Sequence, residues 1–392
     1  MLCRGKYTYK MTNYIHRKLE EKVTSFLEFF PVIGITGPRQ SGKSTMLKNL
    51  LKDSFRYVTF DDYRNINLFY EDPEKFISIY NQHVVFDEIQ KVPELFDYIK
   101  RVVDEKRDFK GRFIITGSAQ FSMMSSITES LAGRIGLLTL LPFQYNEIVD
   151  TNYQPSEFRG CYPEVVINNY KNRESWFNSY LETYIEKDAR AISNIGNLSD
   201  FRRLIKILAA NCSQILNLSS LANVLGISVN TVKRWVSILE ASYIIFLLPP
   251  YFNNFNKRII KSKKIYFYDT GLVAALTGIQ NEGMYENGPL AGPIFENYVV
   301  AEIKKQLHHS ANYSEMYFYR TSNGVEVDLL IENGLNLKMI EIKNSETFKP
   351  RMINPMKSII QKNDSGYLLY KGVEWPYTEK IKIWPYQKFL LD

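Results

Sequence analysis

Residues 37–44 of this 392-residue chain are GPRQSGKS, which fits the pattern GxxxxGK[ST] in full and directly follows the apolar run PVIGIT. A glycine-rich turn between a buried strand and a helix lets backbone N–H groups and the helix N-terminus converge on phosphate oxygens. We expect the lysine to reach the β- and γ-phosphates of ATP and the serine to ligate Mg²⁺. The residues expected to bind ATP are Gly37, Pro38, Arg39, Gln40, Ser41, Gly42, Lys43, Ser44 and Thr45.

Short apolar runs alternate with helical stretches over the first part of the chain. The runs cover residues 31–37, 56–62, 84–90, 112–118 and 137–143. Strands that alternate with helices favour a parallel sheet that is covered on both faces. We therefore predict an α/β fold whose N-terminal domain, at residues 14–155, is a P-loop ATPase domain with a parallel sheet.

The third and fourth apolar runs end in polar side chains that suit phosphate chemistry. The third, VVFDE, delivers Asp87 as a second Mg²⁺ ligand and Glu88 as the group that polarises the attacking water. A solvated strand end is the alternative, which the P-loop upstream disfavours. The fourth, FIITGS, ends with Thr116 and Ser118. A polar side chain there either senses the γ-phosphate or belongs to a plain strand-to-loop turn.

Four stretches, GPRQSGKST, VVFDEIQ, FIITGSA and ESLAGR, together resemble the AAA-type ATPase domain of a large bacterial and archaeal family. Members carry a C-terminal domain of uncharacterised function that is similar to PD-(D/E)xK nucleases, and the resemblance runs from about Tyr14 to about Thr347. It implies that Arg134 is an arginine finger or sensor for its own ATP or a neighbour's. A surface arginine is the alternative. It also suggests self-association as a ring or dimer. Cys161 departs from the family, which usually has a second glycine there.

Residues 218–242, LSSLANVLGISVNTVKRWVSILEAS, have the pattern of a helix-turn-helix, with Gly226 in the turn and Ser228 as the cap of the second helix. The two strand-like runs that follow could form the hairpin of a winged helix, with Lys261, Lys263 and Lys264 near its tip. Winged helices bind DNA or contact proteins, and both interpretations stay open. The expected DNA-binding residues are Asn230, Thr231, Lys233 and Arg234.

Four residues near the C-terminus follow the order of a PD-(D/E)xK site: Glu296 on an expected helix, Asp328 in GVEVDLLI, then Glu341 and Lys343 in KMIEIK. Side chains alternate along a strand, so Glu341 and Lys343 share one face while their apolar neighbours pack inward on the other. In such nucleases the carboxylates, here Asp328 and Glu341, hold Mg²⁺ and the lysine positions water for attack on phosphate. Such folds also persist as binding modules that do not cut.

The composition limits the cellular setting more than the chemistry. The net charge of +7 is compatible with a nucleic-acid partner without requiring one. Three scattered cysteines without a CxxC pair argue against a disulfide framework and a zinc site, so we expect a cytoplasmic protein. No apolar run is long enough for a membrane span, and the basic N-terminus lacks the apolar core of a signal peptide. Met1 and Met11 are both possible starts.

The motifs divide the chain into four expected parts. They are the ATPase domain at residues 14–155, a helical lid or linker at 156–216, a winged helix-turn-helix at 217–284 and a restriction-endonuclease-like α/β domain at 285–392. The sequence favours a Mg²⁺-dependent ATPase that acts on or near DNA. It leaves open a non-cutting ATP switch that binds a protein partner, and a Mg²⁺-dependent DNA endonuclease that ATP regulates.

Overall fold

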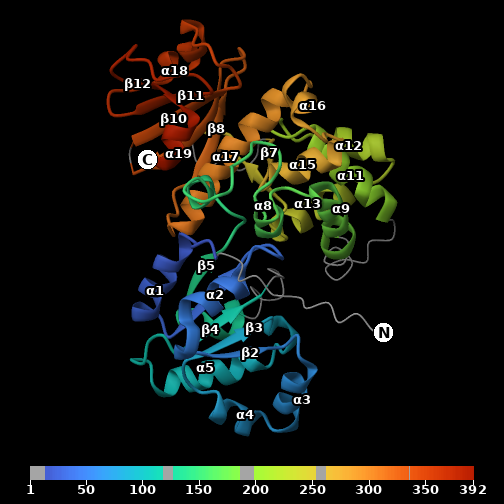
Figure 1. The fold of residues 1–392 in the computed structure, drawn as a ribbon, viewed down its shortest axis with the longest axis vertical. Helices are drawn as coiled ribbons and strands as arrows, with labels where there is room; N and C mark the ends of the chain where they lie inside the picture. The colour runs from blue at the N-terminus through green and yellow to red at the C-terminus, as the bar shows by residue number, and fades with distance from the viewer. Residues whose placement is uncertain (1–13, 118–126, 186–197, 253–261, 335) are drawn as a thin grey trace, which may run out of the picture.

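The structure is a computed structural model that describes residues 14–117, 127–185, 198–252, 262–334 and 336–392. Ser118 and Lys261, both singled out above, lie outside these residues. Figure 1 shows three units: an N-terminal one built around one sheet, a helical middle one, and a C-terminal one with a second sheet. Among the described residues, no helix has the length and apolar character needed to cross a membrane.

The N-terminal unit contains the expected parallel sheet, whose strands are β1 (Val32–Thr36), β2 (Arg56–Thr59), β3 (Val84–Asp87), β4 (Phe113–Thr116) and β5 (Ile135–Thr139). They lie in the order β2-β3-β4-β1-β5, and every pairing is parallel. The helices are α1 (Leu19–Phe29), α2 (Lys43–Leu51), α3 (Tyr63–Glu71), α4 (Pro73–Ile79) and α5 (Leu95–Glu105). The prediction of five parallel strands that alternate with helices is confirmed.

Alternation along the strands explains why both faces of this sheet are covered. Phe86 and Ile115 belong to one apolar cluster, with residues of α3, α4 and α5. Their neighbours Val85 and Ile114 belong to another, with residues of α1 and α2. A strand buried on both faces has no polar alternation, which is why these segments appear as continuous apolar runs in the sequence.

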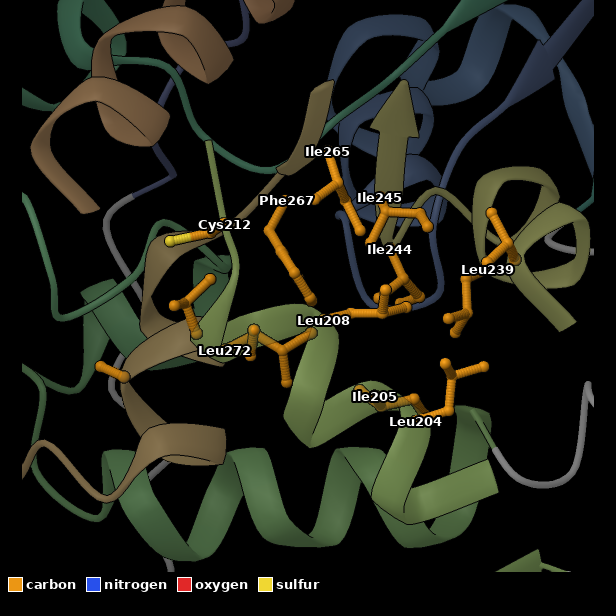
Figure 2. Close-up of a cluster of buried hydrophobic side chains, with 14 of the residues drawn as sticks. Leu204, Ile205, Leu208, Cys212, Leu239, Ile244, Ile245, Ile265, Phe267 and Leu272 are labelled. Atoms are coloured by element: carbon orange, nitrogen blue, oxygen red, sulfur yellow. The ribbon is translucent and has the colours of Figure 1, made fainter. Parts of the chain in front are cut away.

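The middle unit consists mainly of helices. These are α8 (Pro163–Ile167), α9 (Arg173–Tyr180), α11 (Leu198–Ala210), α12 (Leu218–Leu225), α13 (Val229–Ala241), α15 (Thr270–Thr277) and α16 (Glu282–Glu286). The short helix α7 (Tyr145–Ile148) precedes this unit, and its buried apolar residues belong to a separate apolar cluster. Strands β6 (Ile245–Leu248) and β7 (Lys264–Phe267) form an antiparallel pair. Figure 2 shows how Leu208 of α11, Leu239 of α13 and Ile265 of β7 point into one core. That core runs from Phe158 to Ile294, so the segments 156–216 and 217–284 share it.

The C-terminal unit has a mixed sheet next to the long helix α17 (Ala291–His309). Its strands are β8 (Met316–Arg320), β9 (Glu326–Asn333), β10 (Asn336–Lys343), β11 (Ser365–Tyr370) and β12 (Ile381–Pro385), in the order β12-β11-β10-β9-β8. Strands β8, β9 and β10 pair antiparallel, and β10, β11 and β12 pair parallel. The remaining helices are α18 (Asn354–Ile359) and α19 (Tyr386–Leu391).

Several short helical turns complete the fold. The 3₁₀ turns are Lys52–Ser54, Ile89–Lys91 and Pro350–Ile353, and the π-helical turns are Ile127–Leu131 and Leu181–Ile185.

The C-terminal half of α17 joins the C-terminal unit to the chain that leaves β5. Lys305 donates to the carbonyl of Phe143 at 3.1 Å, and Glu302 accepts from the backbone N–H of Tyr145 at 2.6 Å. The ring Nε2 of His309 accepts from the N–H of Leu141 at 3.1 Å. These polar side chains are almost fully buried, and each has a polar partner, as burial requires.

Candidate nucleotide site and acidic cluster

Two glycines give the P-loop its shape. Gly37 has φ +139° and Gly42 has φ +93°, both in the region that side chains rarely adopt. A Cβ on Gly37 would lie 2.1 Å from the carbonyl oxygen of Leu140, so no other residue fits there. Gly42 caps α2, which begins at Lys43. The loop therefore turns sharply between β1 and the N-terminus of α2, as phosphate binding requires.

The ammonium of Lys43 lies inside this loop. Its Nζ donates to the carbonyl oxygens of Gly37 at 3.0 Å and Pro38 at 2.9 Å, and the residue is 6% exposed. A lysine held at the mouth of a phosphate loop carries a positive charge to the place where the β- and γ-phosphates bind. In the rest of the predicted loop, Ser41 is buried, Arg39 is half-buried, and Gln40 and Thr45 are exposed.

Asp87 is held beside Ser44 by hydroxyl groups from three elements. The Ser44 hydroxyl on α2 donates to Asp87 Oδ2 at 3.0 Å, and Tyr57 on β2 donates to the same oxygen. Thr116 at the end of β4 donates to Oδ1. A hydroxyl and a carboxylate at this distance are the hard oxygen ligands that Mg²⁺ takes, so the residues fit the ion. Thr116 thus contacts the predicted metal ligand directly, and its role as a sensor of the γ-phosphate stays a prediction. Sequence analysis missed Tyr57.

Glu88 follows at the carboxyl edge of the sheet in an unusual backbone conformation. Its φ is +56° and its ψ +42°, and its Oε2 accepts from the side-chain amide of Gln90. A non-glycine residue in the left-handed region costs free energy, which functional sites often tolerate because it aims a side chain. The conformation turns the chain sharply after Asp87, at the edge that carries the P-loop.

Arg17, which sequence analysis missed, supports the P-loop by a hydrogen bond to its backbone. Its guanidinium donates to the carbonyl of Ser41 at 2.7 Å, to the carbonyl of Leu141 at 2.6 Å, and to Glu147 at 3.1 Å. It is 4% exposed and lies over the ring of Phe143. A buried arginine with three acceptors fixes the segments that it joins. No motif indicates this contact, because Arg17 and its acceptors are far apart in sequence.

Arg134 is not brought to the nucleotide site. It directly precedes β5, and its guanidinium pairs with Asp104 at 2.7 and 2.8 Å. Its carbonyl accepts from the N–H of Val32, the first residue of β1. Arg134 therefore lies at the amino edge of the parallel sheet, whereas the P-loop lies at the carboxyl edge. In this arrangement Arg134 does not reach the ATP site of its own chain. The geometry still permits the other predicted role, in which Arg134 acts on the ATP of a neighbouring subunit.

The outer face of α13 carries the expected DNA-binding residues. Asn230, Lys233 and Arg234 are exposed on this helix. Thr231 is half-buried, and its backbone N–H and hydroxyl both contact the cap residue Ser228. Three of the four side chains therefore face outward, while Thr231 helps to begin the helix.

The C-terminal unit brings its four predicted residues, Glu296, Asp328, Glu341 and Lys343, together, and Glu326, which was not predicted, joins them. We define the acidic cluster as the carboxylates Glu296, Glu326, Asp328 and Glu341. The backbone N–H of Ile342 donates to Asp328 at 2.8 Å, and Lys343 pairs with Glu341 and, at 3.6 Å, with Asp328. Both faces of β10 are covered, so Glu341 is only 4% exposed. Glu341 is thus as buried as its apolar neighbours, which corrects the expectation that only they pack inward.

A residue from another unit completes the cluster. Lys264 of β7 places its Nζ 2.6 Å from Glu326, 3.1 Å from Glu296 and 3.9 Å from Asp328. Burial and the charge of Asp328 raise the pKa of Glu296 to about 7, and the same causes raise the pKa of Glu341 to about 8. Among the described residues, no group of three or more His, Cys, Asp or Glu side chains has the geometry of a metal site. The cluster in this form does not fit a divalent metal, because an ammonium lies between its carboxylates.

Comparisons with known families agree with the division into three units. Residues 30–149 match the family model described as an AAA domain. Residues 151–283 match a domain of unknown function (DUF8612), and residues 291–389 match another (DUF4143). The parallel sheet, the loop geometry and the first match support a P-loop ATPase domain of AAA type in the N-terminal unit. The nuclease likeness of the C-terminal unit stays a prediction.

Related proteins are similar over most of their length. An uncharacterized protein of Mycobacterium tuberculosis is 29% identical over 332 residues, which is 84% of this chain and 74% of that protein. An uncharacterized protein of Methanocaldococcus jannaschii is 26% identical over 365 residues, 83% of this chain and 78% of that protein. Both similarities extend beyond the segment that matches the AAA domain.

Among solved structures, the Walker-type ATPase of Pyrococcus abyssi is 15% identical with a TM-score of 0.43, covering 66% of this chain and 94% of that one. DnaA from Aquifex aeolicus, bound to AMPPCP, is 13% identical with a TM-score of 0.27, covering 57% of this chain and 85% of that one. TM-scores below 0.5 identify neither a fold nor a function for this chain.

Proposed function

We propose that this chain is a Mg²⁺-dependent ATPase of AAA type that acts on or near DNA. The observation that carries the ATPase proposal is the position of three side chains around the P-loop. Lys43 lies inside the loop, and the Ser44 hydroxyl is 3.0 Å from Asp87. This set supplies the phosphate cation and both protein ligands of Mg²⁺, and Glu88 supplies the candidate base next to them. Bound Mg²⁺ would neutralise charge that develops on the phosphates.

The DNA proposal is supported by α13 and by its connection to the ATPase unit. Asn230, Lys233 and Arg234 form an exposed polar and basic face on a helix that begins after a tight turn at Gly226. Tyr243, shortly after α13, contacts the hydroxyl of Thr36 at the end of β1 at 2.8 Å. Tyr180 donates to the carbonyl of Arg39 in the P-loop at 3.5 Å. The middle unit thus contacts the P-loop. DNA bound to α13 of the middle unit can therefore affect ATP bound at the P-loop.

The experiment that separates this function from the alternatives is ATP hydrolysis with and without duplex DNA. We expect DNA to raise the rate of phosphate release by the full chain. ATP binding with hydrolysis that no DNA changes would favour the non-cutting switch with a protein partner. The ATP-regulated endonuclease has less support, because Lys264 lies where its metal would bind.

The double variant Lys233→Ala and Arg234→Ala is expected to weaken DNA binding. Each of these side chains presents a cation to the DNA backbone, so the slope of log K against log[salt] should become shallower by about one for each phosphate that the protein no longer neutralises. Fluorescence anisotropy with a labelled duplex at several salt concentrations measures both the affinity and the slope.

The matched control is Lys206→Ala, which removes an exposed lysine from α11 in the same unit. Its affinity and slope should equal those of the unchanged chain. If the double variant keeps the salt slope of the unchanged chain, α13 does not contact DNA, and this face becomes a candidate for protein contact.

A further inference from the structure

We propose that the acidic cluster is a receptor for the ammonium of Lys264, and that this internal cation, instead of a divalent metal, is what the cluster holds. The contact docks β7 of the middle unit to the sheet of the C-terminal unit. A divalent cation can enter the cluster only when Lys264 is absent or withdrawn. This inference does not rest on the ATPase proposal, because it concerns residues of α17, β7, β9 and β10 and none of the residues placed around the P-loop.

The contacts of Lys264 are those of a built site. Its Nζ lies within 4 Å of Glu296, Glu326 and Asp328, which come from α17 and β9, and the residue is only 3% exposed. An ammonium has three donors, and these carboxylates surround it. Tyr266, two residues further along the same strand face, donates to Glu296 at 2.7 Å. Two side chains of one strand therefore bind the acid of α17.

The backbone around Lys264 holds it in this position. The N–H of Ile265 donates to the carbonyl of Gln214 at 3.0 Å, and the N–H of Leu216 donates to the carbonyl of Lys263 at 2.8 Å. Asn297, next to Glu296, joins its side-chain amide to both the N–H and the carbonyl of Phe267, each at 2.8 Å. Lys264 thus lies on strand β7, whose main chain is hydrogen-bonded to a side chain of α17. This fixed backbone distinguishes Lys264 from a surface lysine.

Charge and space argue against a metal beside this ammonium. Four carboxylates face three cations, because Lys343 pairs with Glu341 and Arg320 with Glu326, in addition to Lys264. A carboxylate-bound Mg²⁺ needs its oxygens at about 2.0–2.1 Å in an octahedral arrangement. Glu296 Oε1 lies 3.1 Å and Asp328 Oδ1 lies 3.9 Å from the ammonium of Lys264, so a metal bound to these oxygens would lie close to that ammonium. A metal and an ammonium in one buried pocket would repel each other strongly.

The test is a titration of the full chain with Mn²⁺ in the absence of nucleotide. The electron paramagnetic resonance signal of free Mn²⁺ measures how much of the ion is bound. We expect the unchanged chain to show no site that depends on Asp328. Lys264→Met should gain one, with Mn²⁺ affinity raised by about tenfold or more because a nearby like charge is gone. Adding Asp328→Asn to Lys264→Met should abolish the gain. Lys263→Met, which changes the exposed neighbouring lysine, should resemble the unchanged chain.

Two results would overturn the proposal. One is a Mn²⁺ site in the unchanged chain that Asp328→Asn removes, and this comparison does not depend on whether Lys264→Met folds. The other is a folded Lys264→Met chain, with an unchanged circular dichroism spectrum, that gains no Mn²⁺ affinity. Lys264→Arg keeps the positive charge and should exclude Mn²⁺ as the unchanged chain does.

Discussion

Lys43→Ala is expected to abolish ATP turnover and to weaken ATP binding severely. The ammonium lies inside the P-loop, 2.9 Å and 3.0 Å from two of its carbonyl oxygens, where it would contact the β- and γ-phosphates. Charge-assisted hydrogen bonds to phosphate are among the strongest that a side chain makes. Because the same cation would also stabilise charge in the transition state, we expect hydrolysis to slow by about 10²-fold or more.

The control for this variant is Lys75→Ala, an exposed lysine on α4 of the same unit. Equilibrium binding of a fluorescent ATP analogue and steady-state phosphate release should be unaffected in Lys75→Ala. In Lys43→Ala, binding should be severely weakened and phosphate release abolished. Circular dichroism shows whether both variants are folded. A folded Lys43→Ala chain that hydrolyses ATP at the unchanged rate would disprove the assignment of the P-loop.

Glu88→Gln should separate binding from chemistry. Glutamine has nearly the same shape as glutamate but cannot accept a proton, so ATP should still bind while hydrolysis slows by about 10²-fold or more. Glu88 directly follows Asp87, and its left-handed backbone turns the chain at the carboxyl edge of the sheet. Rapid-quench measurement of a single turnover, with enzyme in excess over ATP, reports the chemical step itself.

Glu105→Gln is the matched control, because Glu105 ends α5 and lies apart from Asp87 on an exposed position. It should leave both binding and the single-turnover rate unchanged. If Glu88→Gln hydrolyses ATP as fast as the unchanged chain, another group activates the water, and Glu88 serves only to shape the turn.

The N-terminal sheet was predictable because its signals are local. Strands β1, β3 and β4 are buried on both faces, so they appear as continuous apolar runs between helical stretches. The P-loop needs residues at fixed spacing in one turn, so its motif is local as well. Parallel order then brings the ends of β1 and β3 to one edge, which places Asp87 beside Ser44.

The contacts that sequence analysis missed join residues that are far apart in the chain. Arg17 binds the carbonyl of Leu141, Tyr57 reaches Asp87 from the neighbouring strand, and Lys264 enters the acidic cluster from another unit. Such partners depend on how elements pack, which no local pattern encodes. Arg134 is the opposite case, because a local motif predicts a role at the ATP site that its position does not match. It lies at the amino edge of the sheet, opposite the P-loop, and pairs with Asp104.

The most direct test of the central claim is phosphate release from ATP by the unchanged full chain, with Mg²⁺ present and with Mg²⁺ removed by EDTA. We predict steady hydrolysis that requires Mg²⁺ and is abolished in Lys43→Ala, because Ser44 and Asp87, 3.0 Å apart, are the proposed ligands of the ion. No hydrolysis with Mg²⁺, with or without DNA, or hydrolysis that survives in both EDTA and Lys43→Ala, would contradict it.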